Sequence, residues 1–281
     1  MSRLLITLLL PLFITACGSA DDDTDYNVSL SLGDITKGVA DINITITSGD
    51  GTAAEGDVII TPIMEMTSGM VHSTPVAQTS GALNSEGQFS STAYFLMPSG
   101  QMGSWYVDVT FANKTTRHDI MVDMSMADRQ QLKGGISDQI SQMEMAVARP
   151  YYLYDLGRHV SSTMNTFTVY IAARETLMDY KSISDSVVLN AGTTYELNTA
   201  SVVVEMCSDN CNSEGNWKTA MANSERPGEY TADQLNLNND NNDSVEVRLT
   251  VAGERKTSDG KQEGNNATFS FDDSKAMPMN M

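Results

Sequence analysis

Short runs of alternating apolar and polar residues dominate this chain and leave few folds open to it. Residues 26–32 and 39–47 read YNVSLSL and VADINITIT, with a period of two residues. That period puts every second side chain on the same face of an extended strand, and it does not fit a helix. Similar runs recur between turns rich in Gly, Ser, Asn and Pro. The pattern predicts an all-β protein built from immunoglobulin-like antiparallel β-sandwiches.

The length and a change of pattern near the middle suggest two such domains. A chain of 281 residues is long enough for two domains of ordinary size. Between the strand-rich halves, Ile136, Ile140, Met143 and Val147 follow a weak helical spacing and predict a short helix. We therefore expect a signal peptide over 1–16, an acidic tether over 17–25, a first β-sandwich over 26–122, a connector over 123–147, a second β-sandwich over 148–273 and a Met-rich tail over 274–281.

Charge and motifs exclude several classes of function. The chain has 17 basic and 36 acidic residues, a net charge of −19. Such a surface repels phosphate backbones, so no nucleic-acid partner is expected. Neither a G-x-S-x-G nucleophile motif, an H-E-x-x-H zinc motif nor a phosphate-binding loop is present, and the whole chain has 3 His. The sequence predicts a protein that is not an enzyme.

The N-terminus indicates where the protein resides. Arg3 precedes an apolar run over residues 4–14 that is too short to span a bilayer, and small residues follow it. The tetrad Ile14-Thr15-Ala16-Cys17 resembles the lipobox of bacterial lipoproteins. The resemblance implies that Cys17 is acylated and becomes the mature N-terminus. Because Gly18 follows it, the resemblance favours an outer-membrane lipoprotein in the cell envelope, facing the periplasm.

Two further cysteines are expected to pair. Cys207 and Cys211 lie four residues apart in the segment MCSDNC. In an oxidising periplasm a short-loop disulfide is the expected state. A second metal site is the alternative interpretation, although C-x₃-C without a nearby His is poor ligand spacing.

Methionine is abundant, with 18 residues, and it clusters. Met64, Met66, Met70 and His72 fall within nine residues, on an expected strand that runs into a turn. Thioether sulfur and imidazole nitrogen together suit Cu(I), and residues two apart on a strand face the same way. The other interpretation is that these methionines fill the core, because Met packs irregular gaps well. Both interpretations stay open at this point.

A family resemblance supports the copper interpretation. Met64-Glu65-Met66, Gly69-Met70-Val71-His72, Gly87-Gln88-Phe89, Phe95-Leu96-Met97 and Gly103-Ser104-Trp105 resemble, in this order, the motifs of YtkA-like and FixH-like periplasmic β-sandwich domains. The resemblance implies copper handling, with a periplasmic copper protein or an oxidase-assembly factor as partner. An insertion over residues 98–102 separates this chain from the pattern, so either Met97 or Met102 could supply the ligand from that side.

A fainter copy of the same segments follows in the second half. Residues 58–61, 87–90 and 105–111 parallel 202–205, 228–231 and 245–251. The second copy lacks the soft ligands and carries the MCSDNC turn in their place.

The sequence therefore predicts a lipid-anchored protein that binds Cu(I) through Met64, Met66, Met70 and His72, with Met97 or Met102, for copper buffering or delivery. The alternative hypothesis is a structural or adhesive surface lipoprotein whose sandwiches bind a protein or glycan without any metal.

Overall fold

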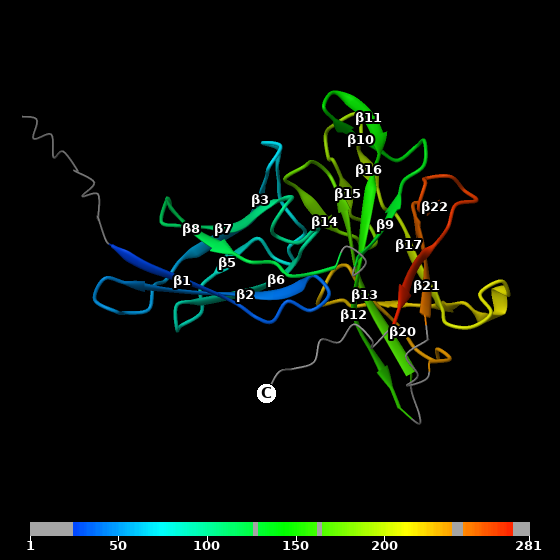
Figure 1. The fold of residues 1–281 in the computed structure, drawn as a ribbon, viewed down its shortest axis with the longest axis horizontal. Coiled ribbons are helices and arrows are strands. Elements are labelled where there is room, and N and C mark those ends of the chain that lie inside the picture. Colours follow the sequence, from blue (N-terminus) through cyan, green and yellow to red (C-terminus); the bar gives the residue numbers. More distant parts are fainter. Residues whose placement is uncertain (1–24, 126–128, 162–164, 238–243, 272–281) are drawn as a thin grey trace, which may run out of the picture.

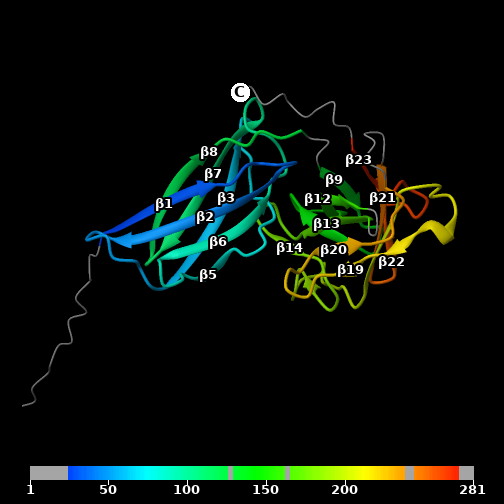
Figure 2. The same ribbon diagram turned by 90° about the horizontal axis from the view of Figure 1, so that it is seen from below.

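The computed structural model describes residues 25–125, 129–161, 165–237 and 244–271. Two β-sandwiches follow each other along the chain and lie side by side along the long axis of the molecule (Figures 1 and 2). Each sandwich packs two sheets of antiparallel strands around its own apolar core. The predicted all-β class is confirmed. Among the described residues no helix is long and apolar enough to cross a membrane.

The first sandwich contains eight strands in two sheets. One sheet has the order β1-β2-β6, and the other has the order β4-β3-β7-β8 with β5 also paired to β3. Inward side chains such as Ile42, Ile44, Val58, Ile60 and Val107 are fully buried between them. The strands are β1 (Tyr26–Leu32), β2 (Val39–Ser48), β3 (Asp57–Met66), β4 (Val71–His72), β5 (Ser80–Ala82), β6 (Gln88–Tyr94), β7 (Gly103–Phe111) and β8 (Lys114–Ile120).

The second sandwich is built on the same plan with additional short strands. One sheet has the order β19-β20-β13-β12-β9 with β14 on β13, and the other has the order β18-β17-β21-β22 with β23 on β21. Two small hairpins, β10-β11 and β15-β16, flank them. The strands are β9 (Arg129–Lys133), β10 (Gln139–Gln142), β11 (Met145–Ala148), β12 (Pro150–Val160), β13 (Asn165–Arg174), β14 (Tyr180–Ser182), β15 (Val188–Leu189), β16 (Leu197–Asn198), β17 (Val202–Cys207), β18 (Lys218–Thr219), β19 (Met221–Ala222), β20 (Glu229–Ala232), β21 (Ser244–Val251), β22 (Glu254–Lys256) and β23 (Ala267–Ser270).

The two sandwiches share a strand order. The sheet β1-β2-β6 corresponds to β12-β13-β20, and β3-β7-β8 corresponds to β17-β21-β22. The three pairs of similar sequence segments therefore lie on strands with corresponding positions in the two sandwiches. In the order of the chain, these pairs are β3 with β17, β6 with β20, and β7 with β21.

The predicted helical connector is wrong. Residues 139–148 form the hairpin β10-β11, and the described part of 123–147 contains no helix. Met143 and Glu144 make the turn with positive φ values of 49° and 63°, which is the conformation of a tight type I′ hairpin turn. Ile136 is 94% exposed, so the apparent helical stripe does not face a core. Four apolar residues at helical spacing were too few to outweigh pairing between the two short strands.

An aromatic cluster joins the two sandwiches. Tyr94 at the end of β6 stacks on Tyr170 of β13, with ring centroids 3.6 Å apart and planes 7° from parallel. Tyr154 of β12 donates a hydrogen bond of 2.8 Å to the backbone carbonyl of Tyr94. All three rings are buried. Because burying aromatic surface is strongly favourable, this contact fixes the sandwiches against each other.

Candidate metal centre

The β3-β4 hairpin brings the four central candidate ligands onto one face of a sheet. Met64 pairs directly with His72, and the backbone N–H of Met66 donates to the carbonyl of Met70 at 2.9 Å. Directly paired residues project to the same side, as do residues two apart on a strand. The even-numbered side chains at 64, 66, 70 and 72 therefore form a two-by-two array. Gly69, with φ of +80°, supplies the positive φ that the turn requires.

The array runs from the core of the first sandwich to its rim. Met64 is fully buried and His72 is 5% exposed, whereas Met66 and Met70 are half-buried. Opposite Met66 on β7 lies Gly103, where a Cβ atom would come within 2.4 Å of the carbonyl oxygen of Glu65. The absence of a side chain at this position leaves no side chain directly opposite Met66 on that strand.

The imidazole of His72 is held in one tautomer. Its Nδ1 lies 2.9 Å from the carbonyl oxygen of Ser73, which can only accept, so Nδ1 carries the proton. Nε2 is then a bare acceptor, and it is buried with no hydrogen-bond partner among the described residues. Burial lowers the pKa of His72, and the positive charges of Arg174 and Arg129 lower it further, against the opposing hydrogen bond to Ser73. A neutral imidazole with a free Nε2 lone pair is the form that binds metals.

Trp105 forms one wall of the array. It pairs with Met64 on the side away from His72, and its ring meets the imidazole edge-on with centroids 5.4 Å apart. Phe95 contacts the same indole in a second edge-to-face arrangement at 5.3 Å. These rings exclude water from the buried end of the array.

The two alternative ligands, Met97 and Met102, lie at the same end of the sandwich in different environments. The carbonyl of Met97 accepts the indole N–H of Trp105 at 2.9 Å, and its half-buried side chain packs against the core. The carbonyl of Met102 accepts the N–H of Thr67 at 3.1 Å, but its side chain is 45% exposed. Met97 is the better placed of the two to reach the buried end of the array.

The candidate ligands on and near this hairpin provide only thioether sulfur and imidazole nitrogen. Over the described ranges, no group of three or more His, Cys, Asp or Glu side chains is arranged to hold a metal ion. Cys17, the predicted signal peptide and the Met-rich tail lie outside the described residues. The four central candidate ligands thus lie on one hairpin, while Met97 and Met102 lie between β6 and β7, and the described residues contain no comparable cluster of oxygen ligands.

Cys207 and Cys211 form a disulfide, with Cα atoms 5.7 Å apart. It closes the β17-β18 connection, which corresponds in position to the β3-β4 hairpin. Trp217 packs there, donating its indole N–H to the carbonyl of Cys211 at 3.0 Å while the guanidinium of Arg248 lies 3.7 Å from the ring centroid. The two sulfurs bond to each other and are not available as thiolate ligands.

A buried ionic cluster in the second sandwich was not predicted from the sequence. The carboxylate of Asp138 accepts from Arg149 Nε at 2.6 Å and Lys256 Nζ at 2.8 Å, and it also accepts the hydroxyl of Tyr151. Asp138, Arg149 and Lys256 are each no more than 1% exposed. Burial and the neighbouring carboxylate raise the pKa of Tyr151 well above its ordinary value. The sequence feature that could have indicated this cluster is the basic residue Arg149, which stands with Pro150 directly before the aromatic run of β12.

This cluster has the character of a structural clamp. The guanidinium of Arg149 also donates to the carbonyls of Gln139, Arg174 and Tyr195 and to the side chain of Asn190. Its hydrogen-bonding groups are thereby used within the protein. The cluster joins the β10-β11 hairpin, the 190–195 loop and β22 to the start of β12.

Comparison with known proteins assigns no family. No protein-family model matches the chain, and no curated protein matches it. Among solved structures, the crystal structure of the outer membrane decaheme cytochrome OmcA aligns with 88% of this chain and 70% of that chain, at 7% identity and a TM-score of 0.22. A TM-score this low does not establish a common fold, so this neighbour assigns no function to the chain.

Proposed function

We propose that this protein is a lipid-anchored protein of the cell envelope that binds Cu(I) through Met64, Met66, Met70 and His72. The observation that carries the proposal is the β3-β4 register, which puts three thioethers and one imidazole on a single sheet face. Its role is to buffer Cu(I) or to pass it to another periplasmic copper protein.

The chemistry of this donor set fits the metal. Thioether and imidazole are soft or borderline ligands, and such sets select Cu(I) over hard cations. All four ligands are neutral, so the complex keeps the single positive charge of the ion. The net charge of −19 attracts the positively charged Cu(I) ion to the protein. The graded burial suits transfer, because an ion can first meet the half-buried Met66 and Met70 and then reach His72.

Two observations support an envelope location. The first is the lipobox-like tetrad ending at Cys17. The second is the disulfide between Cys207 and Cys211, since disulfides persist in oxidising compartments and are rare in the cytosol. Thioether ligands also suit such a compartment, because they do not oxidise to disulfides as thiolates do.

The test is competition for Cu(I) between the reduced-copper chelator bicinchoninate and the mature protein. Changing Met64, Met66 and Met70 together to Leu keeps volume and hydrophobicity, so the free energy of unfolding should fall by less than about 1.5 kcal/mol per site. Copper binding should be lost while the fold survives. The matched control changes Met143, Met206 and Met221 to Leu. These residues lie outside the first sandwich, and Met206, like Met64, is fully buried. Equal Cu(I) affinity in the site variant and the wild type would refute the proposal.

A second candidate function is favoured by the environment of Met64. This residue is 0% exposed and belongs to the core that contains Ile60, Val107 and Phe95. Such packing is what a core-filling methionine would show, and it fits a structural or adhesive lipoprotein without a metal. The same titration separates the two, because a core-filling role predicts no Cu(I) retention against the chelator in any variant.

A further inference from the structure

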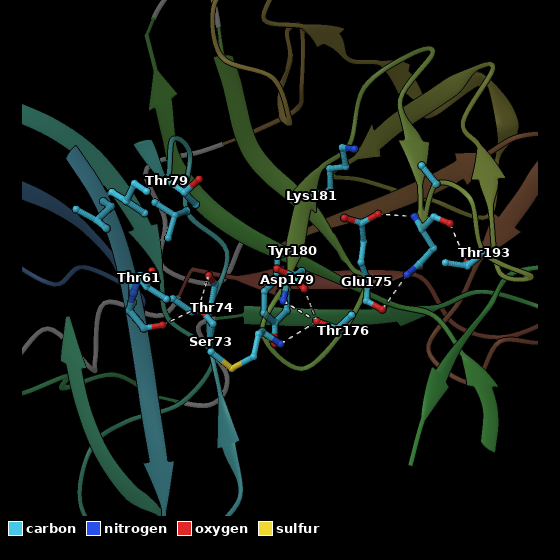
Figure 3. A pocket seen from close by; sticks show the side chains of 17 residues that line it. Thr61, Ser73, Thr74, Thr79, Glu175, Thr176, Asp179, Tyr180, Lys181 and Thr193 are labelled. Atoms are coloured by element: carbon cyan, nitrogen blue, oxygen red, sulfur yellow. Dashed lines mark hydrogen bonds between the residues drawn. The ribbon is translucent and has the colours of Figure 1, made fainter. Parts of the chain in front are cut away.

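A cavity lies between the two sandwiches, and none of the four residues of the methionine array lines it. It encloses about 620 Å³, within the usual range for small-molecule sites. One wall comes from β3 and the segment that follows β4, and the other comes from the turn between β13 and β14 and the 190–193 loop (Figure 3). We propose that this interdomain cleft binds a short neutral oligosaccharide. The proposal is independent of copper binding.

Hydrogen-bonding groups with unused capacity face the cleft from both walls. On the first wall, the hydroxyl of Thr61 has no hydrogen bond to any described residue. On the second wall, Glu175 uses one carboxylate oxygen to accept the backbone N–H of Asn190, and Asp179 uses one to accept the hydroxyl of Thr176. Each carboxylate keeps a second oxygen without a hydrogen bond to any residue that the structure describes.

Lys181 complements these acceptors with donors. Its ammonium has three N–H groups and donates one of them to the carbonyl of Val188 at 3.0 Å, so within the described part of the chain two remain for a ligand. A ligand that both donates and accepts through many hydroxyl groups satisfies such a mixed set. Carbohydrates have this character, whereas an aliphatic ligand would leave the groups unpaired at a cost in free energy.

Apolar surface lies between the polar groups. Ile59 and Met178 are 48% and 37% exposed, and they line opposite walls of the cleft. Half-buried Tyr180 contributes an aromatic surface on the second wall. Pyranose rings have an apolar C–H face beside their hydroxyl edges, so one sugar can pack on these side chains while hydrogen-bonding to the polar ones.

The charge of the site favours a neutral ligand over an acidic one. Glu175 and Asp179 outnumber Lys181 within the cleft, and the whole chain has a net charge of −19. A polyuronate or sulfated glycan would meet repulsion both at the site and on approach.

The cleft is preformed. The N–H of Ser73 donates to the carbonyl of Leu177 across it at 2.9 Å, beside the stacked pair Tyr94 and Tyr170. A rigid site loses less conformational freedom when a ligand binds, which favours measurable affinity for a small ligand.

The test uses maltotriose, cellotriose and triacetylchitotriose as neutral probes and trigalacturonate as the acidic comparison. At least one neutral trisaccharide should bind with a Kd of about 1 mM or tighter by isothermal titration, and trigalacturonate should bind at least tenfold more weakly. Thr61→Val removes one hydroxyl at constant shape and should weaken binding by roughly 3- to 10-fold. Asp179→Asn should weaken binding to a similar degree.

Thr45→Val is the matched control, because Thr45 is also a half-buried strand residue whose hydroxyl makes no hydrogen bond to a described residue. It should leave binding unchanged. Failure of every neutral probe to bind, equal binding of trigalacturonate, or full affinity in both cleft variants would overturn the proposal. Retained Cu(I) affinity in the cleft variants would show that the two sites are separate.

Discussion

Met64 and His72 occupy directly opposed positions of the β3-β4 pairing, on the inner face of the sheet. One is fully buried and the other is 5% exposed. The pair therefore places a sulfur atom and an imidazole side by side in a water-poor environment, where a histidine is expected to stay neutral.

The pH dependence of stability should report this histidine. Burial lowers the pKa of His72 from its ordinary value of 6.5, so between that value and the lower native pKa the unfolded chain binds one proton more than the native protein does. The free energy of unfolding should therefore decrease as the pH falls below 6.5. His72→Gln should reduce this slope in urea titrations, whereas the exposed His159→Gln should preserve it. Cu(I) affinity should also persist below pH 6.5, and an affinity that falls at 6.5 would contradict the lowered pKa.

Removing Tyr94 should uncouple the two sandwiches. Tyr94→Ala deletes the ring that stacks on Tyr170, and large aromatic truncations in buried positions cost about 3–5 kcal/mol. Differential scanning calorimetry should then resolve two transitions where the wild type shows one. Tyr26→Ala, at an edge of the first sandwich, is the control and should lower stability without splitting the transition. A single transition in Tyr94→Ala would show that other contacts couple the domains.

The buried carboxylate of Asp138 should contribute strongly to the stability of the second sandwich. Asp138→Ala removes the carboxylate that pairs with Arg149 and leaves Glu254 as the remaining acidic partner of Lys256, and removing one member of such a buried group costs about 3–5 kcal/mol. Chemical denaturation should show a large fall in the midpoint. Asp259→Ala, which removes a partly exposed carboxylate, should leave the midpoint nearly unchanged. Equal effects of the two substitutions would argue against the clamp.

The disulfide should protect both thiols and contribute moderate stability. Cys207 and Cys211 should react with an alkylating reagent only after reduction. The closed loop is short, so replacing both residues with Ser should lower the free energy of unfolding by no more than about 2–3 kcal/mol. Mass spectrometry measures how far Cys207 and Cys211 are alkylated in the native protein. Rapid labelling without reductant would contradict the disulfide.

The anchor can be tested by fractionating cells. Cys17→Ser should leave the precursor without lipid and move the protein out of the membrane fraction. Cys207→Ser serves as the control, because it replaces a cysteine that lies outside the lipobox-like tetrad. A Cys17 variant that stays in the outer membrane at the normal level would exclude lipid anchoring through this residue.

Period-two patterns predicted most of the long strands closely. The run expected over 26–32 coincides with β1, and the expected strand over 39–47 is one residue shorter than β2. Successive side chains of these strands point alternately to a buried and a solvated face, so the strands can be recognised from the alternation of apolar and polar residues. The connector was misread because Ile140 and Val147 pair across a hairpin at a spacing that also fits a helix.

Sequence pattern also identified the even-numbered face at Met64 and Met66, but it could not establish what lies across the sandwich interface. The stacking of Tyr94 on Tyr170 and the hydrogen bond from Ser73 to Leu177 join residues far apart in the chain. No local periodicity encodes such contacts. For the same reason the cleft, whose walls come from both sandwiches, had no signature in either half of the sequence.

The corresponding hairpins of the two sandwiches are secured differently. In the second sandwich the bond between Cys207 and Cys211 fastens the chain where it leaves β17. In the first, the β3-β4 turn from Met66 to Met70 has backbone hydrogen bonds and no covalent fastening. If Cu(I) binds as we propose, the ion becomes a removable cross-link at that place. The first hairpin would then be less mobile when copper is abundant and more mobile when copper is scarce. A partner that contacts this hairpin would thereby respond to the copper supply.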